Sequence, residues 1–66
     1  MKVEVFEDGE LVYECESSDE SLLYNNIALF INQWEGGNLD LETKGIDNEE
    51  IVDLLEYRVS LTNREF

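Results

Sequence analysis

The sequence predicts an α+β domain in which an N-terminal β-hairpin and one short strand form an antiparallel three-stranded sheet, packed against two helices in the order ββαβα. Three observations lead to this prediction. Residues 1–16 alternate between apolar and polar side chains around Asp8-Gly9. Residues 17–37 repeat apolar side chains at helical spacing, and a second helical pattern follows later in the chain. The 66 residues are expected to form a single small acidic domain, residues 1–66.

The alternation in residues 1–16 decides the loop length of the predicted hairpin. A two-residue turn would place Glu4 on the same face as Tyr13. A three-residue loop, Glu7-Asp8-Gly9, gathers the apolar side chains on one face instead, with Gly9 in the left-handed position of a bulged turn. We expect the inward face to carry Met1, Val3, Val5, Leu11, Tyr13 and Cys15, and the outward face to carry Lys2, Glu4, Phe6, Glu10, Val12 and Glu14.

The central helix, within residues 17–37, is the element around which we expect the rest of the chain to pack. Ser17 and Glu20 have the spacing of a capping box at its start, and Gly36 suits a left-handed residue just past its end. Its apolar side chains recur at helical spacing and predict one continuous buried stripe. The stripe consists of Leu23, Ile27, Phe30, Ile31 and Trp34.

A second apolar patch on the same helix faces another direction. Leu22 and Leu29 lie about 100° round the helix from the main stripe. Residues 21–34 carry no charge, although the whole chain is at −13. We therefore expect this helix to be covered on more than one side, with the second patch meeting either the last helix or another subunit.

Residues 38–43 predict the third strand, because Leu39 and Leu41 alternate with Asp40 and Glu42. A right-handed crossover through the central helix places this strand parallel to the second strand. If it lies beside the first strand, the sheet is antiparallel with strand order 2-1-3. That is the arrangement we expect.

A second helix is predicted from residue 47 onward. Asp47 is a good N-cap, Glu50 follows three residues later, and Ile46 and Ile51 have the spacing of a hydrophobic staple. Helical periodicity puts Ile51, Leu54 and Leu55 on the buried face and Glu49, Asp53 and Glu56 on the opposite side.

Arg58 leaves the end of this helix open between two interpretations. Periodicity carries Arg58 to the middle of the apolar face, so either it pairs with a carboxylate or the helix stops near Tyr57. In the second case Tyr57, Val59 and Leu61 alternate as a fourth strand. The continued helix is the favoured interpretation.

The side chains that most catalytic and metal sites require are missing. The chain has no His, and its one cysteine, Cys15, therefore has no His partner. Cys15 falls on the inward face of the hairpin, where we expect a small core residue. The acids within residues 38–50 do not fall at EF-hand offsets, which disfavours a calcium site. The sequence therefore predicts no enzyme activity, no cofactor and no metal.

The expected location is the cytoplasm. The sequence has no long apolar run that would span a membrane, and no basic segment followed by an apolar one that would direct secretion. A single cysteine cannot form an internal disulfide, which agrees with a reducing compartment.

Negative charge is the dominant feature of the composition. Seventeen Asp and Glu against four Lys and Arg give a net charge of −13, beyond the magnitude of about 2–8 that suits the solubility of a small domain. Such an excess repels nucleic acid and anionic membranes, and it steers a protein toward basic surfaces.

The acids predict two arrays, one on the hairpin and one on the second helix. The hairpin array consists of Glu4, Glu7, Asp8, Glu10, Glu14 and Glu16, followed by Asp19 and Glu20, and the helix array consists of Glu49, Asp53 and Glu56. The partner-binding residues expected from these arrays are Glu4, Glu7, Asp8, Glu10, Glu14, Glu49, Asp53 and Glu56. Candidate exposed apolar anchors beside this charge are Phe6, Val12, Tyr24, Tyr57 and Phe66, whereas Trp34 is expected in the core.

Small size, strong acidity and the lack of catalytic groups make the chain resemble phage-encoded inhibitors of host DNA-handling or defence enzymes, including anti-CRISPR and anti-restriction proteins. The resemblance is one of composition and involves no specific motif. It implies a viral protein in the host cytoplasm that blocks the basic groove of a nucleic-acid-binding enzyme by nucleic-acid mimicry. The alternative hypothesis is a small structural domain that homo-oligomerises through the central helix, its acid serving only solubility. A monomer and a homodimer both remain open.

Overall fold

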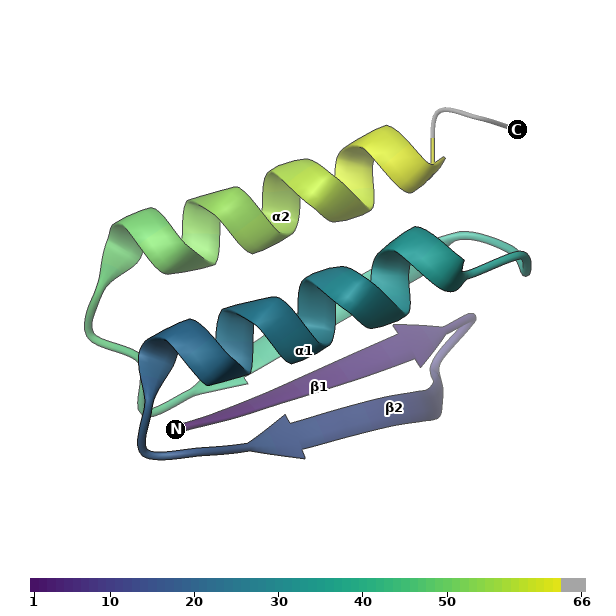
Figure 1. Ribbon diagram of the computed structural model, residues 1–66. Coiled ribbons are helices and arrows are strands. Elements are labelled where there is room, and N and C mark those ends of the chain that lie inside the picture. Colours follow the sequence, from purple (N-terminus) through teal and green to yellow (C-terminus); the bar gives the residue numbers. More distant parts are fainter. Residues whose placement is uncertain (64–66) are drawn as a thin grey trace.

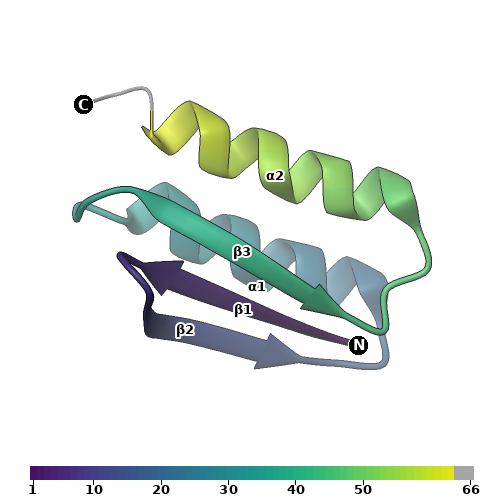
Figure 2. The same cartoon turned by 180° about the vertical axis from the view of Figure 1, so that it is seen from behind.

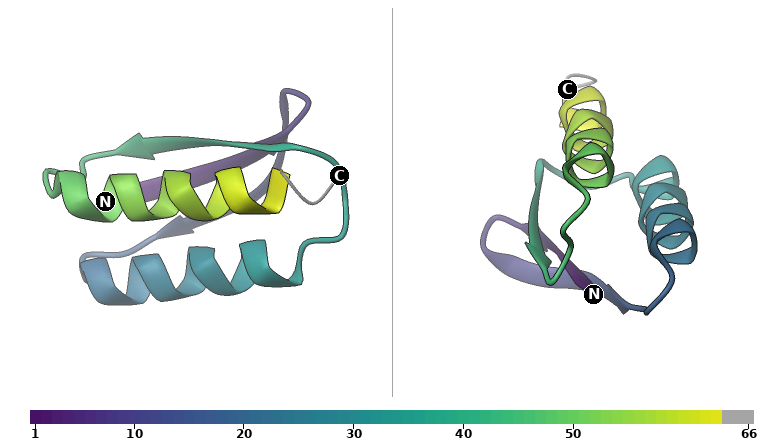
Figure 3. Two further views of the ribbon diagram at one scale, coloured as in Figure 1. Left: turned by 90° about the horizontal axis from the view of Figure 1, so that it is seen from above. Right: turned by 90° about the vertical axis from the view of Figure 1, so that its left-hand side faces the viewer.

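The computed structural model describes residues 1–63. Its elements, in chain order, are β1 (Lys2–Glu7), β2 (Glu10–Glu16), α1 (Glu20–Gln33), β3 (Leu39–Lys44) and α2 (Glu49–Asn63). The strands form one antiparallel sheet in the order β2-β1-β3, and both helices lie on the same side of it (Figures 1 and 3). The predicted α+β fold and the 2-1-3 strand order are confirmed. Neither described helix covers the other face of the sheet, which is seen in front in Figure 2.

The β1–β2 turn contains two residues, so the predicted three-residue loop is wrong. Asp8 and Gly9 both have positive φ values, 51° and 83°, as the type I′ turn favoured by Asp-Gly requires. A β-bulge keeps apolar side chains on the inner face despite the short turn. The register shifts between Val5 and Phe6 of β1, so Val12 is the extra residue on β2.

This bulge reverses the predicted faces of two side chains, Leu11 and Val12. Val5 pairs with Tyr13 on the inward face, as predicted, whereas Leu11 pairs with Phe6 and therefore turns outward. Leu11 is 45% exposed, and Val12, which we expected on the outward face, packs against the core instead. A local irregularity thus keeps the inner face apolar without lengthening the turn.

The core lies between the sheet and the two helices. Its buried side chains are Val3, Val5, Leu23, Ile27, Ala28, Ile31, Leu39, Leu55 and Val59. The two aromatic members of the predicted helix stripe, Phe30 and Trp34, are half-buried. The ring of Tyr13 stacks on Phe30 at 4.5 Å between centroids, and Phe30 meets Trp34 at 5.4 Å. These three aromatic rings join β2 to the end of α1.

The caps of α1 differ from the prediction at both ends. Asp19 is the N-cap, and its Oδ1 accepts hydrogen bonds from the backbone amides of Ser21 and Leu22 at 2.9 and 3.3 Å. Ser17 acts one step earlier, accepting a hydrogen bond from the Asp19 amide at 3.0 Å, so the predicted capping box is wrong. At the other end Gly36 is not left-handed; its glycine is required because a Cβ there would collide with the Trp34 indole.

Helix α2 begins one residue later than predicted. Asn48, and not Asp47, is its cap, since Asn48 Oδ1 accepts a hydrogen bond from the Glu50 amide at 3.0 Å. The helix then runs through Tyr57 and Arg58 to Asn63, which confirms the continued helix over the fourth strand.

Arg58 pairs with a phenol instead of a carboxylate. Its Nε donates to Tyr24 Oη at 2.8 Å and its Nη1 donates to Asn32 Oδ1 at 3.3 Å. The guanidinium carbon also lies 5.6 Å from the centre of the Tyr24 ring. The residue that looked misplaced on an apolar face therefore links α2 to α1.

Three leucines that we expected to be covered are exposed. Leu54, which was placed on the buried face of α2, is 47% exposed, and Val59 is buried on that helix beside Leu55. Leu22 and Leu29 of α1 are 55% and 57% exposed, so α2 does not cover the second patch.

Candidate acidic binding surface

The face of the sheet opposite the helices carries a regular pattern of charge. Val3 and Val5 of β1 are buried under the helices, so Lys2, Glu4 and Phe6 point to the other side. Residues opposite one another on neighbouring strands share a face. From β2 through β1 to β3, three rows therefore cross this face: Glu16, Lys2 and Lys44; Glu14, Glu4 and Glu42; and Leu11, Phe6 and Asp40. We call these nine residues the sheet face.

Two lysines offset part of the repulsion within the middle row of glutamates. Strands lie about 4.8 Å apart, and like charges directly opposite one another destabilise a sheet. Lys44 Nζ lies 2.8 Å from Glu4 Oε1, and Lys2 Nζ lies 3.5 Å from Glu14 Oε2. A side-chain hydrogen bond from Lys44 holds the pKa of the Glu4 carboxyl below its ordinary value, and the same contact raises the pKa of the Lys44 ammonium.

The remaining carboxylates of the sheet face are not neutralised in this way. Glu16, Glu42 and Asp40 are exposed and have no ion-pair partner within residues 1–63. Phe6 lies among them at the turn end, where it lines a hollow of about 340 Å³ together with Gly9, Asp40 and Glu42. The face therefore combines unpaired negative charge with a half-buried aromatic side chain.

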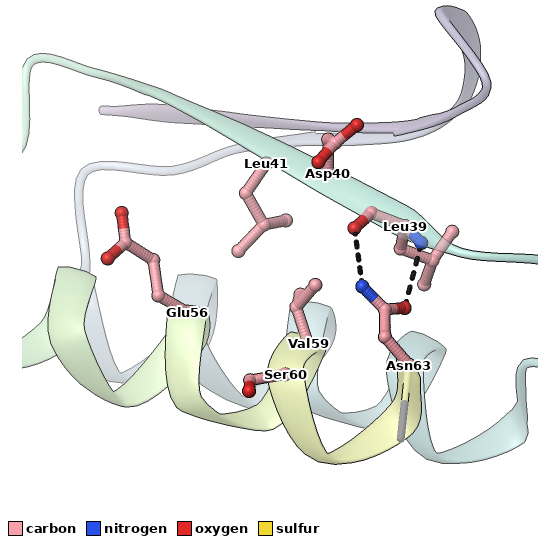
Figure 4. A pocket seen from close by; sticks show the side chains of 7 residues that line it. All are labelled: Leu39, Asp40, Leu41, Glu56, Val59, Ser60 and Asn63. Carbon is pink, nitrogen blue, oxygen red and sulfur yellow. Dashed lines mark hydrogen bonds between the residues drawn. The ribbon is translucent and has the colours of Figure 1, made fainter. Parts of the chain in front are cut away.

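A groove of about 460 Å³ lies between β3 and α2 (Figure 4). Leu41 and Val59 point into it from opposite sides, whereas Asp40 belongs to its β3 side and Glu56 to its α2 side. The whole lining consists of Leu39, Asp40, Leu41, Glu56, Val59, Ser60 and Asn63. The groove thus has an apolar floor between two carboxylate-bearing elements.

The groove brings the sheet face next to the helix array, because Asp40 belongs to the sheet face and also lines the groove with Glu56. Of the hairpin array, Glu4 and Glu14 lie on the sheet face. Of the helix array, Glu49, Asp53 and Glu56 are exposed on α2, and Glu56 reaches the groove.

The other predicted site residues lie near the β1–β2 turn. Asp8 and Glu10 are exposed there. Glu7 is engaged inside the protein, since its Oε2 accepts a hydrogen bond from the Gly37 amide at 2.6 Å. The predicted anchors Phe6 and Tyr57 are half-buried and exposed respectively, and Phe66 lies outside the described residues.

Asp40 and Glu42 are the site residues that sequence reasoning missed. In the sequence their alternation with Leu39 and Leu41 indicates a strand, and their oxygen atoms suggest only a calcium site that the spacing disfavours. Combined with the 2-1-3 strand order, that alternation already placed them on the outer face beside β1. The missing step was the register, which puts Glu42 opposite Glu4.

Neither a cluster of metal-binding side chains nor a membrane-spanning helix occurs in the part of the chain that the structure describes. No group of three or more Cys, Asp or Glu side chains is placed there to hold a metal ion. Neither α1 nor α2 is long and apolar enough to cross a membrane. No family model matches the chain, and no curated protein or solved structure resembles it at a significant level.

Proposed function

We propose that this protein binds the Lys- and Arg-lined groove of a nucleic-acid-binding protein and inhibits that protein by excluding its nucleic acid. The observation that supports the proposal is the sheet face, which carries five carboxylates and two lysines and adjoins the acidic side of α2 through the groove. Complementary charge speeds encounter and selects basic partners. Phe6, set among the carboxylates, supplies an apolar contact that fixes the register.

The spacing of the carboxylates suits a basic partner surface that normally binds the phosphates of a nucleic acid. Cross-strand neighbours in the middle row are about 4.8 Å apart. Along α2, the three- and four-residue steps between Glu49, Asp53 and Glu56 correspond to about 4.5–6 Å of helical rise. Phosphates on one DNA strand rise about 3.4 Å per nucleotide. In both acidic arrays, neighbouring carboxylates are thus a few ångströms apart. This is the same scale as the spacing of the phosphates that the partner's cationic groove binds.

Affinity capture with two matched variants tests this proposal. The surface variant combines Asp40→Asn, Glu42→Gln and Glu56→Gln. The control variant combines Glu35→Gln, Asp47→Asn and Glu50→Gln, which removes the same number of charges from exposed positions away from the sheet face and the groove. Each protein is immobilised and exposed to nuclease-treated lysate, and bound proteins are eluted with salt or with DNA.

We expect the wild type and the control variant to retain nucleic-acid-binding proteins that added DNA displaces, and the surface variant to lose them. Binding should weaken steeply as ionic strength rises, because exposed charges are screened over about 10 Å at 0.1 M salt. Retention of only neutral or acidic proteins, or equal retention by both variants, would contradict the proposal.

A second candidate function, self-association through the helices, is favoured by a different observation. Leu22 and Leu29 of α1 are more than half exposed, and Leu54 and Leu61 of α2 are 47% and 42% exposed. The uncharged side of α1 is where two copies of so acidic a chain can approach one another with the least repulsion. Sedimentation velocity across a range of concentrations decides the matter: a dimer that Leu29→Gln dissociates supports this function, and a wild-type monomer at high concentration excludes it.

A further inference from the structure

The outer edge of β3 presents backbone groups that the sheet leaves unpaired. β3 lies at the end of the strand order and bonds to β1 on one side only. The Leu39 amide and carbonyl point to the other side, where they meet the Asn63 side chain. Because backbone direction alternates with a period of two residues, Leu41 and Thr43 point to that side as well. Within residues 1–63 their backbone groups have no partner there.

Asn63 marks this edge as a place where a strand fits. Its Oδ1 accepts a hydrogen bond from the Leu39 amide at 2.9 Å, and its Nδ2 donates to the Leu39 carbonyl at 3.1 Å (Figure 4). One donor and one acceptor at these distances are what a residue of an added antiparallel strand supplies to its partner. The side chain of Asn63 therefore stands in for the first residue of an absent strand, and the next positions remain open.

The opposite edge of the sheet is less suited to such pairing. β2 contains the bulge at Val12, and bulges interrupt the regular row of donors and acceptors that an added strand needs. β3 pairs with β1 without any register shift. The regular edge is thus the one that borders the groove, with Leu41 and Val59 below it.

The charges around this edge indicate what kind of strand it takes. A residue added opposite Leu41 shares its inward face and enters the apolar groove, whereas residues opposite Asp40 and Glu42 share the sheet face. Exposed carboxylates on that face select Lys or Arg at these positions. A second copy of this chain is disfavoured, because pairing β3 with β3 would bring Asp40 and Glu42 close to their own counterparts in two chains of net charge −13.

We propose that the free edge of β3 pairs with an extended segment of a protein partner in which Lys or Arg alternates with apolar residues. This inference rests on the proposed function, which supplies a basic partner, and adds the way in which that partner is held. Backbone hydrogen bonds to Leu41 and Thr43 supply the alignment, the groove takes the apolar side chains, and the sheet face takes the cationic ones.

A synthetic peptide and two variants test the inference. The probe is an acetylated and amidated seven-residue peptide of alternating Lys and Val. Its counterpart carries N-methyl groups on the valines, whose amides would face Leu41 and Thr43, so it cannot pair with β3 along that edge. Thr43→Pro removes the outward amide of β3 and keeps the ladder to β1, since proline is tolerated where a strand edge faces outward. Thr43→Val keeps the amide and serves as the matched control.

We expect the peptide to protect the Leu41 and Thr43 amides from hydrogen exchange at low salt. Affinity should fall about tenfold for Thr43→Pro and for the N-methylated peptide, and should not change for Thr43→Val. The N-methylated peptide tests the wild-type fold directly, so the result does not depend on how the proline variant folds.

The possible outcomes distinguish failure of the pairing at β3 from failure of the proposed docking function. Equal binding of both peptides, or of the peptide to Thr43→Pro, overturns the pairing at β3 and leaves the acidic docking function standing. Protection mapped to β2 overturns it as well. If the wild type binds neither peptide, the edge pairing is wrong, and the capture experiment with the surface variant then decides whether the docking function also fails.

Discussion

The sheet face and the outward side of α1 show opposite surfaces to solvent. The sheet face carries seven charged side chains among its nine residues, arranged in rows and partly held in ion pairs. Beyond Glu20 at its first position, α1 carries none, since residues 21–34 are uncharged, and its outward side exposes Leu22 and Leu29. A net charge that served only solubility would have no reason to avoid the outward side of one helix. The separation indicates that the charged surface and the apolar surface are suited to different contacts.

The largest expected effect comes from breaking the contact between the layers. Leu55 is fully buried whereas its neighbour Leu54 is 47% exposed. Leu55→Ala should lower the free energy of unfolding by about 2–5 kcal/mol, because it leaves a cavity beneath α2. Leu54→Ala should change it by about 0.5 kcal/mol or less. Urea denaturation followed by circular dichroism measures both, and equal losses would show that Leu54 contributes to the core as much as Leu55 does.

A smaller effect is expected where the two helices are joined. Arg58→Met removes the hydrogen bonds to Tyr24 and Asn32 and should cost about 1–2 kcal/mol of unfolding free energy. Tyr24→Phe removes only the hydroxyl acceptor and should cost less. A double-mutant cycle between Arg58 and Tyr24 isolates their coupling. A coupling energy near zero would mean that the link between the helices contributes nothing to their association.

The ion pair on the sheet face predicts a pH dependence with a defined sign. The pKa of Glu4 is lowered in the folded protein, so its contribution to stability is present above the ordinary carboxyl pKa and is lost as the pH falls through the lowered value. The pKa of Lys44 is raised, so its contribution is present below the ordinary lysine pKa and is lost as the pH rises through the raised value.

Lys44→Met should therefore destabilise the protein most between about pH 5 and pH 10, with the difference from wild type shrinking on the acid side. Thermal unfolding at a series of pH values measures this difference. Lys2→Met is the matched control, because it removes the same charge from the longer pair, in which the two atoms are 3.5 Å apart. An effect of Lys44→Met that does not vary with pH would contradict the assigned pair.

The smallest effect is expected on the exposed side of the helices. Leu29→Gln replaces a side chain that is 57% exposed and should alter the unfolding free energy by about 0.5 kcal/mol or less. A larger loss, measured by urea denaturation at low protein concentration, would show that Leu29 contributes to the core of the single chain. The outward side of α1 would then not be the exposed apolar surface that contrasts with the sheet face.

Local patterns were sufficient for the elements and their order. The alternation of residues 38–43 and the uncharged apolar stripe of α1 needed only neighbours in the sequence, and both gave the correct element. The course of α2 past Arg58 was also predicted, but its partner was not. Tyr24 lies 34 residues away, and no local signal marks a phenol as the acceptor for a guanidinium.

The remaining differences are tertiary in origin. Asp47 and Asn48 are both competent caps, and the structure uses Asn48, whose Nδ2 also donates to Glu20 Oε2 at 3.2 Å. The bulge at Val12 reconciles a turn chosen by Asp8-Gly9 with a core that needs Tyr13 inside. For the site, the sequence was sufficient to predict the negative charge and the acids of the hairpin. The groove could not be predicted, because it lies where Asn63 contacts Leu39, 24 residues away in the chain.

Trp34 gives the protein a built-in optical probe. It is the only tryptophan in the chain, and its indole Nε1 donates to the Gly37 carbonyl at 2.8 Å, two residues before β3 begins. The emission of this indole depends on whether α1, the connection that follows it and the tip of β1 remain docked together. Stopped-flow fluorescence can thus follow both global unfolding and occupancy of the nearby strand edge on the native chain, without any attached dye.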